Sequence, residues 1–319
     1  MFPTVLYRCR SLQYLDLSWN GIMGSIPKAV GGLSSLTHLD ISYNITGVLP
    51  STLFRCRSLQ YLDLSWNGMT GSISKAVGNL SSRTHLDISN NRIIGMFPTT
   101  LYRCRSLRYL DLRWNQIAGS IHESIGNLSN LAHLDVSINN IVGVFPMALY
   151  RCRSLRYLDL RWNHIGGQLP DDIGHGLGTN LSMLDLSGNN LNGTIPASLS
   201  KLQNLQYLAL DNNILTGTIP MELGEMTSLQ KLSLWNNTFN AGILPISLKN
   251  LTNLVVLLVN GCNLIGDFPS YVVRMSELVE LGLSYNLLTG SIHPGVWGLK
   301  KLQQLDVSRD NLTALPRRA

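Results

Sequence analysis

The sequence predicts a repeat solenoid of the α/β class, in which each repeat adds one strand to a single parallel β-sheet. Two observations predict this fold class. The run RCRSLQYLDLSWN at Arg8–Asn20 returns unchanged at Arg55–Asn67 and nearly unchanged at Arg103–Asn115 and Arg151–Asn163. In addition, the pattern L-x-x-L-x-L-x-x-N recurs along the whole chain, mostly every 24 residues. One such unit cannot bury its apolar face alone, so neighbouring units must stack.

A 24-residue period of this pattern is typical of leucine-rich repeats. We therefore expect a horseshoe or superhelix with the sheet on the concave face and short 3-10 or loop segments on the convex face. We predict one domain over residues 1–319 with about 13 repeats, near-identical two-repeat duplications in 1–166 and more divergent repeats in 167–319. The last position of the pattern falls on Asn20, Asn44, Asn67, Asn91, Asn115, Asn139, Asn163, Asn189, Asn213, Asn237, Cys262, Asn286 and Asp310.

Each part of a repeat has a physical cause. In YLDLSWN, Leu15 and Leu17 alternate with Tyr14 and Asp16, so that one side of the strand is buried and the other is wet. The asparagine that follows is expected to turn inward, where its amide can donate to and accept from backbone groups of adjacent coils. The return limb G-x-I-P-x-x-[LIV]-G-x-L supplies the outer wall, and its glycine and proline enforce the turns.

Composition narrows the class of protein. The chain has 319 residues, of which 45% are hydrophobic and 14% charged, and a net charge of +6. This apolar content excludes a disordered chain, and no run approaches the 18–20 apolar residues of a membrane span. The segment 174–178 (GHGLG) lacks the spacing of a phosphate-binding loop and lies where one repeat lengthens, so we interpret it as a loop insertion. We expect no enzymatic activity, no cofactor and no metal.

The cysteines do not form a disulfide pattern. Cys9, Cys56, Cys104 and Cys152 stand two repeats apart, which places them about 9–10 Å apart at the strand spacing of a sheet. A disulfide needs Cα atoms within about 7 Å. We expect all five cysteines, including Cys262, to be reduced and buried as small hydrophobic residues. Arg83 stands where other repeats have leucine and would bury a charge unless its stem reaches solvent.

Outward-facing positions form three columns along the predicted concave face. The first is a row of aspartates, which we interpret as a solvated strand sequence or as a negative surface for a basic ligand. The second alternates tyrosine with histidine, and the third carries tryptophan in alternate repeats. The columns are Asp16, Asp40, Asp63, Asp87, Asp111, Asp135, Asp159 and Asp185; Tyr14, His38, Tyr61, His85, Tyr109, His133 and Tyr157; and Trp19, Tyr43, Trp66, Asn90, Trp114, Ile138 and Trp162.

These columns generate the candidate ligand-binding residues. Tryptophans two strands apart recur about every 9.6 Å, close to the roughly 9.3 Å that three residues of a polyproline-II peptide cover. A proline-rich or basic extended peptide is thus one hypothesis for the ligand. From Tyr207 onward the columns become irregular and more apolar, which favours a specific contact site. The candidates are Tyr14, Trp19, Tyr61, Trp66, Tyr109, Arg113, Trp114, Tyr157, Arg161, Trp162, Lys231, Trp235, Leu258 and Tyr285.

The histidines of the second column raise two questions, whether they bind a metal ion and whether they make ligand binding depend on pH. His38, His85 and His133 lie two repeats apart, too far for one metal ion to bridge two of them. The neighbouring aspartates are expected to raise the pKa of these histidines, which predicts mildly pH-sensitive binding between pH 5 and 7.

Several motifs carry a resemblance to a known family. The turns GSIP and GTIP, and segments such as DDIGHGLGTNLSMLDLSGNNLNGTIPASL and LKNLTNLVVLLVNGCNLIGDFPSYV, resemble ectodomains of plant leucine-rich-repeat receptor kinases, in particular the HAESA-like branch. The resemblance implies binding of a secreted peptide on the inner surface and pairing with a co-receptor. The chain departs from the family because it lacks the paired-cysteine caps, a membrane span, kinase motifs and the Arg-x-Arg strand motif, so we expect a truncated member.

Location and partners follow from the resemblance and from the surface residues. The parent family implies an apoplastic or plasma-membrane ectodomain, although the chain begins without a signal-peptide pattern. N-x-S/T motifs, the sequons for N-glycosylation, agree with an extracellular glycoprotein. Besides Asn44, the candidate glycosylation sites are Asn79, Asn127, Asn180, Asn192, Asn236, Asn250 and Asn311.

Two alternatives to a receptor-type recognition module in signalling or defence stay open. One is an enzyme inhibitor or cell-wall protein of the polygalacturonase-inhibitor type, which would hold acidic polysaccharide such as pectin on the arginines beside the cysteines. The other is a decaying duplicate without function. Nucleic acid is not an expected partner. The arginines are Arg8, Arg10, Arg55, Arg57, Arg103, Arg105, Arg151 and Arg153.

Overall fold

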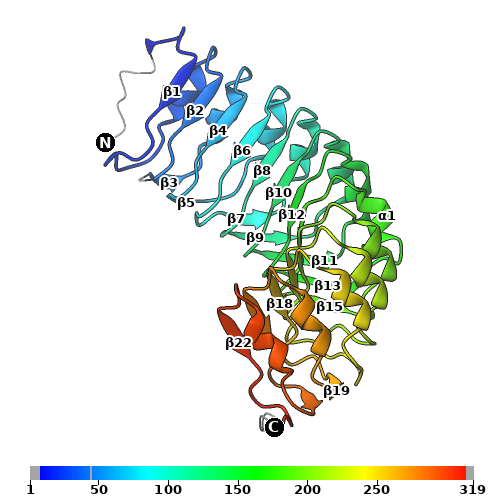
Figure 1. The fold of residues 1–319 in the computed structure, drawn as a ribbon. Helices are drawn as coiled ribbons and strands as arrows, with labels where there is room; N and C mark the ends of the chain where they lie inside the picture. The colour runs from blue at the N-terminus through cyan, green and yellow to red at the C-terminus, as the bar shows by residue number, and fades with distance from the viewer. Residues whose placement is uncertain (1–7, 44, 314–319) are drawn as a thin grey trace. The chain divides into compact units, whose positions relative to one another are not determined.

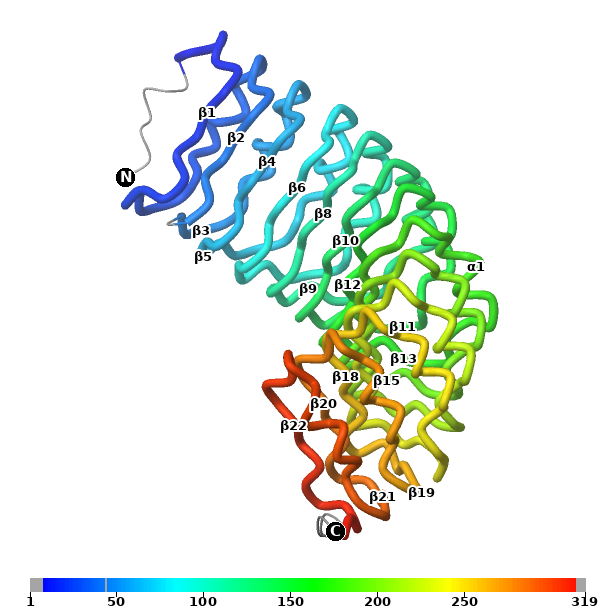
Figure 2. The backbone as a smooth tube through the Cα atoms, in the orientation of Figure 1, coloured from blue at the N-terminus to red at the C-terminus, as the bar shows by residue number. Residues whose placement is uncertain are grey.

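The computed structural model describes residues 8–43 and 45–313, and the chain divides between His164 and Ile165 into two compact units. We call residues up to 164 unit 1 and residues from 165 unit 2. Within each unit the backbone winds in successive coils, one for each sequence repeat (Figure 2). The division falls two residues before the end of the duplicated part of the sequence. Asn44, the second asparagine of the repeat pattern, lies outside the described residues.

Every repeat contributes one three-residue strand to a parallel sheet, as predicted (Figure 1). Neighbouring strands of unit 1 pair without any shift in register, so Tyr14, His38 and Tyr61 lie directly side by side. The strands of unit 1 are β1 (Tyr14–Asp16), β2 (His38–Asp40), β4 (Tyr61–Asp63), β6 (His85–Asp87), β8 (Tyr109–Asp111), β10 (His133–Asp135) and β12 (Tyr157–Asp159). Those of unit 2 are β14 (Met183–Asp185), β16 (Tyr207–Ala209), β17 (Lys231–Ser233), β18 (Val256–Leu258), β20 (Glu280–Gly282) and β22 (Gln304–Asp306).

Short helical turns return the chain to the next strand. They are 3-10 segments of five residues, which confirms the prediction for the return limb. Most begin after a proline, and where Ser74 or His122 replaces it, that side chain accepts a hydrogen bond from the N–H two residues later. The segments are η2 (Lys28–Gly32), η3 (Ser51–Arg55), η4 (Lys75–Asn79), η5 (Thr99–Arg103), η6 (Glu123–Asn127), η7 (Met147–Arg151), η8 (Ala197–Lys201), η9 (Met221–Glu225), η10 (Ile246–Asn250), η11 (Ser270–Arg274) and η12 (Pro294–Gly298).

The segment 174–178 of the sequence takes a different form. It belongs to α1 (Ile173–Leu177), a single turn of α-helix that absorbs the extra residues of the longest repeat and ends at Gly178 with a φ of +75°. Residues 8–43 and 45–313 contain no helix of the length and apolar character needed to cross a bilayer.

A second set of short strands, which the sequence pattern did not predict, follows the inward asparagines. They pair in parallel between neighbouring coils on the side of each unit. The hydrophobic pattern misses them because most of their residues face solvent and so do not alternate. They are β3 (Thr46–Val48), β5 (Gly68–Thr70), β7 (Ile94–Met96), β9 (Gln116–Gly119), β11 (Asn140–Val144), β13 (His164–Gln168), β15 (Asn190–Asn192), β19 (Ile265–Asp267) and β21 (Leu287–Thr289).

The inward asparagines connect adjacent coils through hydrogen bonds, as expected. Asn115 is representative: its Nδ2 donates to the carbonyl of Ile88 in the preceding repeat at 2.9 Å and to that of Leu112 at 3.1 Å. Its Oδ1 accepts from the N–H of Ile93 at 2.9 Å. One buried amide thus satisfies three backbone groups that would otherwise lie unpaired in the interior. At Cys262 the thiol takes over one of these contacts by donating to the carbonyl of Leu234 at 3.4 Å.

The cysteines are free thiols, and four of the five are buried. Cys56, Cys104 and Cys152 each donate from Sγ to a backbone carbonyl of the preceding coil, at 3.4–3.5 Å. The expectation that all five are buried is wrong for Cys9, which is exposed. Cys9 belongs to the first described coil, so no preceding coil covers it.

Arg83 stands at the first leucine position of the repeat pattern, and the core does not accommodate it well. Its side chain is completely buried, and none of its three nitrogens has a hydrogen-bond partner. The alternative that its stem reaches solvent is therefore wrong, and burial lowers the pKa of the guanidinium. A buried, unpaired charge is among the most costly features that a folded protein can contain.

We predict that Asn115→Ala destabilises unit 1 by about 3 kcal/mol, because it leaves the Ile93 N–H and the Ile88 carbonyl buried without partners. Hydrogen exchange of the unit 1 amides measures the loss. Asn20→Ala is the control, since Asn20 is exposed and contacts only carbonyls of its own coil. Equal effects of the two variants would contradict the role of the amide between coils.

We predict that Arg83→Leu raises the urea midpoint of unfolding, with a gain of about 3 kcal/mol, because it removes an unpaired charge from the core. Arg57→Leu, at an exposed position of the preceding coil, should change the midpoint little. A lower midpoint for Arg83→Leu would show that the guanidinium has a stabilising partner.

Candidate functional site on the face of the sheet

The aspartate column begins with a local turn at the end of each strand. In Asp87, Asp111 and Asp135, Oδ1 accepts a hydrogen bond from the N–H two residues later at 2.8–2.9 Å. This turn explains why an acid recurs at the position, since the short carboxylate satisfies a backbone donor that the strand no longer can. The same bond closes the turns after Asp16, Asp40, Asp63, Asp159, Asp185 and Asp306.

The prediction of a solvated aspartate row is wrong for the middle of the sheet. Asp111, Asp135 and Asp159 have no exposed surface, and Asp87 and Asp185 are also buried. Only Asp16 is exposed in unit 1, while Asp40 and Asp63 are half-buried. Tyrosine hydroxyl groups of the neighbouring column lie 3.3–3.4 Å from the carboxylates of Asp111, Asp159 and Asp185, a contact that the alternating pattern does not reveal.

Those rings form a continuous stack along unit 1. Seven side chains, alternately tyrosine and histidine, lie with their centroids 4.1–4.2 Å apart and their planes within 15° of parallel. The hydroxyl groups of Tyr109 and Tyr157 reach Oδ2 of Asp111 and Asp159 at 3.4 Å. Because the strands pair in exact register, every ring stacks on its neighbours. We call this continuous stack from Tyr14 to Tyr157 the wall.

Crowded carboxylates under this wall titrate abnormally. Burial, followed by the charge of neighbouring aspartates, raises the pKa of Asp87 to about 6 and that of Asp111 to about 8. Arg113 offsets part of this repulsion, since its guanidinium lies 3.6 Å from Oδ2 of both Asp111 and Asp135. Arg161 stands in the same relation to Asp159 at 3.4 Å. Both arginines are half-buried and act on the aspartate row from the face of the sheet.

The expectation that the aspartates raise the histidine pKa values is wrong for His85 and His133. Burial lowers both values to about 4, and Arg83 and Arg113, respectively, lower them further. The imidazoles are sandwiched between tyrosine rings, and this loss of hydration outweighs the attraction of the neighbouring acids. Both histidines are therefore neutral between pH 5 and 7, so they do not supply pH sensitivity in that range.

The tryptophan column occupies a strained backbone position. Trp19, Trp66, Trp114 and Trp162 are all at least half exposed, and the φ angles of this column lie between +51° and +58°. Tyr43 stacks between Trp19 and Trp66, with centroids 3.7 and 5.6 Å away. Asparagine and glycine tolerate this left-handed conformation, whereas large aromatic residues rarely adopt it. Exposed aromatic side chains at strained positions are typical of binding surfaces.

In unit 2 the face of the sheet opens into a pocket. The aspartate column is interrupted by Ser233, Leu258 and Gly282, which lie side by side on β17, β18 and β20. The side chains of Asn260 and Leu258 cover Gly282 closely, and a Cβ atom there would come within 2.3 Å of the Asn260 amide. The result is a pocket of about 540 Å³ lined by Trp235, Asn236, Leu258, Asn260, Gly261, Ser284 and Tyr285.

Three of the four candidates that we named in this half line the pocket together: Trp235, Leu258 and Tyr285. Lys231 does not, because its ammonium lies over the ring of Tyr207 at 4.7 Å. Sequence reasoning missed the polar floor, where the side-chain amide of Asn260 hydrogen-bonds with Ser284 Oγ at 2.7 Å and Ser284 Oγ lies 2.7 Å from Asp306 Oδ2. The replacement of a column aspartate by glycine at 282 was the available signal.

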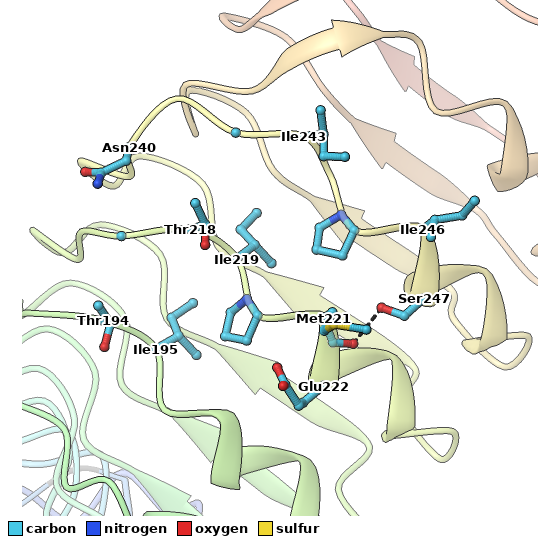
Figure 3. Close-up of a pocket in the computed structure, with 14 residues that line it drawn as sticks. Thr194, Ile195, Thr218, Ile219, Met221, Glu222, Asn240, Ile243, Ile246 and Ser247 are labelled. Carbon is cyan, nitrogen blue, oxygen red and sulfur yellow. Dashed lines mark hydrogen bonds between the residues drawn. The ribbon is translucent and has the colours of Figure 1, made fainter.

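A larger hollow lies on the side of unit 2, at the return limbs of three successive repeats (Figure 3). Its volume is about 930 Å³, and the apolar side chains of Met221, Ile243 and Ile246 are each about two-thirds exposed at its rim. Ser247 donates to the carbonyl of Met221 at 2.5 Å and holds two of the coils together there. The hollow is apolar and lies away from the face of the sheet.

Among the remaining candidates, Tyr14 is exposed, whereas Tyr61, Tyr109 and Tyr157 are half-buried. In unit 1, Arg103 and Arg105 line a polar hollow of about 410 Å³ together with Tyr102, Ser124 and Asn127. Among the sequons, Asn192 is half-buried, and the exposed ones are Asn79, Asn127, Asn180, Asn236, Asn250 and Asn311. Asn236 lines the pocket of unit 2, and its amide donates to Asn212 at 2.8 Å.

Comparison with known proteins agrees with the fold of stacked leucine-rich repeats. A family profile described as leucine-rich repeat region matches residues 4–143 and 146–242. No curated protein matches the chain by sequence alone. Among solved structures, the chain is similar to the plant peptide hormone receptor RGFR1 in complex with RGF2, at 30% identity and a TM-score of 0.71, over 99% of this chain and 58% of the receptor.

Two further solved structures are similar. A TDR receptor shares 26% identity with a TM-score of 0.78, over 97% of this chain and 62% of the receptor. The Arabidopsis receptor kinase HAESA, in complex with the peptide hormone IDA and the co-receptor SERK1, shares 26% identity with a TM-score of 0.74, over 98% of this chain and 60% of the receptor chain. The chain therefore spans about three-fifths of the receptors that it resembles.

We predict that His133→Phe makes stability less dependent on pH. The folded pKa of His133 is about 4, below the value of roughly 6.5 in an unfolded chain, so protonation favours unfolding as the pH falls through this window. The wild type should lose about 1–2 kcal/mol relative to the variant between pH 7 and pH 4.5. Urea unfolding of both proteins at the two pH values measures the difference. A difference that does not change with pH would contradict the lowered pKa.

Proposed function

Because the chain belongs to the leucine-rich repeat proteins, we propose that it is a non-catalytic recognition module that binds an extended peptide on the face of its sheet. Two of the similar solved structures are plant receptors in complex with peptide hormones. The observation that carries the proposal for this chain is the unit 2 pocket, where the column of buried acids gives way to an open apolar site.

The pocket has the chemistry of a site for one side chain of a peptide. Its volume of about 540 Å³ lies in the range of small-ligand sites. Trp235 and Tyr285 supply apolar surface on which an aliphatic or proline side chain can pack, and the exposed Tyr285 carries Arg309 over its ring at 5.2 Å. The amides of Asn236 and Asn260 at the pocket wall can bond to the backbone of an extended peptide.

In unit 1 the same ligand class fits the tryptophan column. Trp66, Trp114 and Trp162 are each about half exposed and recur at the roughly 9.6 Å of two strand spacings. A polyproline-II segment presents a side chain about every 9.3 Å and loses little entropy on binding. We therefore propose that the column prefers proline-rich sequences. Arg113 and Arg161 are engaged with the buried aspartates, so they contribute to the wall rather than to peptide binding.

We also propose a protein partner besides the peptide and an extracellular location for this chain. The apolar rim of the side hollow, at Met221, Ile243 and Ile246, is suited to contact with a second protein such as a co-receptor. An apoplastic location and glycosylation at the exposed sequons agree with the receptors that the chain resembles. A place in the HAESA-like branch rests on the sequence segments quoted above, since the RGFR1, TDR and HAESA receptors match to a similar degree.

A second candidate function rests on the arginines of unit 1. Arg103 and Arg105 line one polar hollow, and the equivalent arginines of the neighbouring duplications are also exposed. Such a row could hold an acidic polysaccharide such as pectin. Co-sedimentation with polygalacturonate separates this candidate from peptide recognition, because Arg103→Ser with Arg105→Ser should abolish it and leave peptide binding unchanged.

We predict that Trp235→Ala weakens binding of a labelled proline-rich decapeptide at least tenfold, because it removes the largest apolar surface of the pocket. Fluorescence anisotropy measures the affinity, and near-ultraviolet circular dichroism verifies the fold. Trp297→Ala is the matched control, because Trp297 is exposed on η12 and does not line the pocket. Unchanged binding by Trp235→Ala, or no binding to the wild type at millimolar peptide, would contradict the proposal.

A further inference from the structure

Two groups of side chains that could bind a metal ion each combine one histidine of the ring stack of unit 1 with two aspartates. Asp63, His85 and Asp87 form the first, and Asp111, His133 and Asp135 form the second. In each group one ligand atom from every residue lies within 4.8 Å of the others. Each group combines two aspartates from adjacent strands with the histidine that precedes the second aspartate. We call them the first and the second triad.

The ring stack fixes the histidine of each triad. His85 is held between Tyr61 and Tyr109, with both centroids 4.2 Å away and both rings nearly parallel. Imidazole nitrogens bind a ligand in the plane of the ring, so an ion at the ring edge would leave the stack intact. The Nε2 atoms of His85 and His133 are buried and have no hydrogen-bond partner. A buried nitrogen of this kind in a restrained ring can accept an ion or a water molecule as its ligand.

An arginine distinguishes the two triads. Arg113 lies 3.6 Å from Oδ2 of both aspartates of the second triad and supplies a positive charge there. The residue at the equivalent place in the first triad is Ser65, two residues after Asp63, and Ser89 after Asp87 corresponds to Ser137 of the second triad. Within residues 8–43 and 45–313, no salt bridge involves Asp63 or Asp87. The first triad therefore holds two close carboxylates without a salt bridge, although the charge of Arg113 on the next coil also acts on Asp87.

We propose that Asp63, His85 and Asp87 bind one divalent transition-metal ion of the zinc type, and that Arg113 takes the place of such an ion in the second triad. One imidazole nitrogen with two carboxylate oxygens suits zinc better than calcium or magnesium, which prefer more oxygen ligands. Three protein ligands leave a fourth position for water. The ion would neutralise both carboxylates. It would also bind Nε2 of His85, which has no hydrogen-bond partner in the protein.

The geometry needs only a small closure to hold the ion. Ligand atoms about 2.1 Å from zinc lie roughly 3.4 Å apart in a tetrahedron, whereas the triad atoms lie within 4.8 Å. Oδ1 of Asp63 and of Asp87 is held by a backbone N–H at 2.8 Å, and an ion at the triad would take the other oxygen of each carboxylate, in competition with the Tyr61 hydroxyl at Asp63. The expectation of no metal considered two histidines two repeats apart, whereas here adjacent strands supply carboxylates to a single histidine.

The test measures the number of zinc ions bound by the untagged full chain. After removal of metal, isothermal titration with Zn²⁺ at pH 7 should give one site for the wild type. His85→Phe keeps a ring in the stack but lacks a ligand, so it should weaken that site at least tenfold. Asp87→Asn, which preserves the acceptor of its turn, should weaken it as well. Titration with Co²⁺ should give visible absorption bands that His85→Phe abolishes.

Variants of the second triad are the matched controls. His133→Phe should leave the single site unchanged, because Arg113 occupies the second triad. Arg113→Ser should raise the number of sites from one to two. The proposal is overturned if the wild type binds no Zn²⁺ at 100 μM, or if His85→Phe binds as the wild type does. A single site in Arg113→Ser would overturn the assigned role of Arg113.

Discussion

The structure depends on the burial of polar backbone at the end of every strand. Each coil bends there into the interior, and the bend leaves N–H and carbonyl groups away from water. The inward asparagine satisfies three of them at once and joins the coil to the preceding one, as Asn115 does with Ile88 and Ile93. Because such a residue is needed once per coil, the period of the asparagines is the period of the fold.

Parallel pairing without a shift in register has a second consequence, because it places identical side chains beside each other. Aspartates that each close a local turn become a column of close carboxylates, and rings that would be isolated in one repeat become a stack. The protein meets the resulting repulsion with partial protonation, with Arg113 and Arg161, and, as we propose, with a metal ion at the first triad. Repetition thus creates chemistry that no single repeat possesses.

The candidate binding pocket of unit 2 lies where the repetition is broken. In unit 2 the column position passes from serine to leucine to glycine, and the wall of acids and rings opens into the pocket beside Trp235. In unit 1 the duplicated repeats retain their wall, and tryptophans stand on it at backbone positions better suited to asparagine or glycine. Ile138 shares this strained position, which is unusual for a β-branched residue. The two units therefore offer different surfaces to a ligand.

The sequence by itself determined the strand of each repeat, the inward asparagines and the 3-10 return limbs, because these depend on period, polarity and turn residues within one repeat. It also indicated Trp235, Leu258 and Tyr285, whose apolar character departs from the columns around them. Only the tertiary structure decided that the aspartates are buried, that His85 and His133 have lowered pKa values, and that Arg83 has no partner. These properties depend on how much water neighbouring coils exclude, and that exclusion follows from side-chain packing between repeats rather than from the pattern within one.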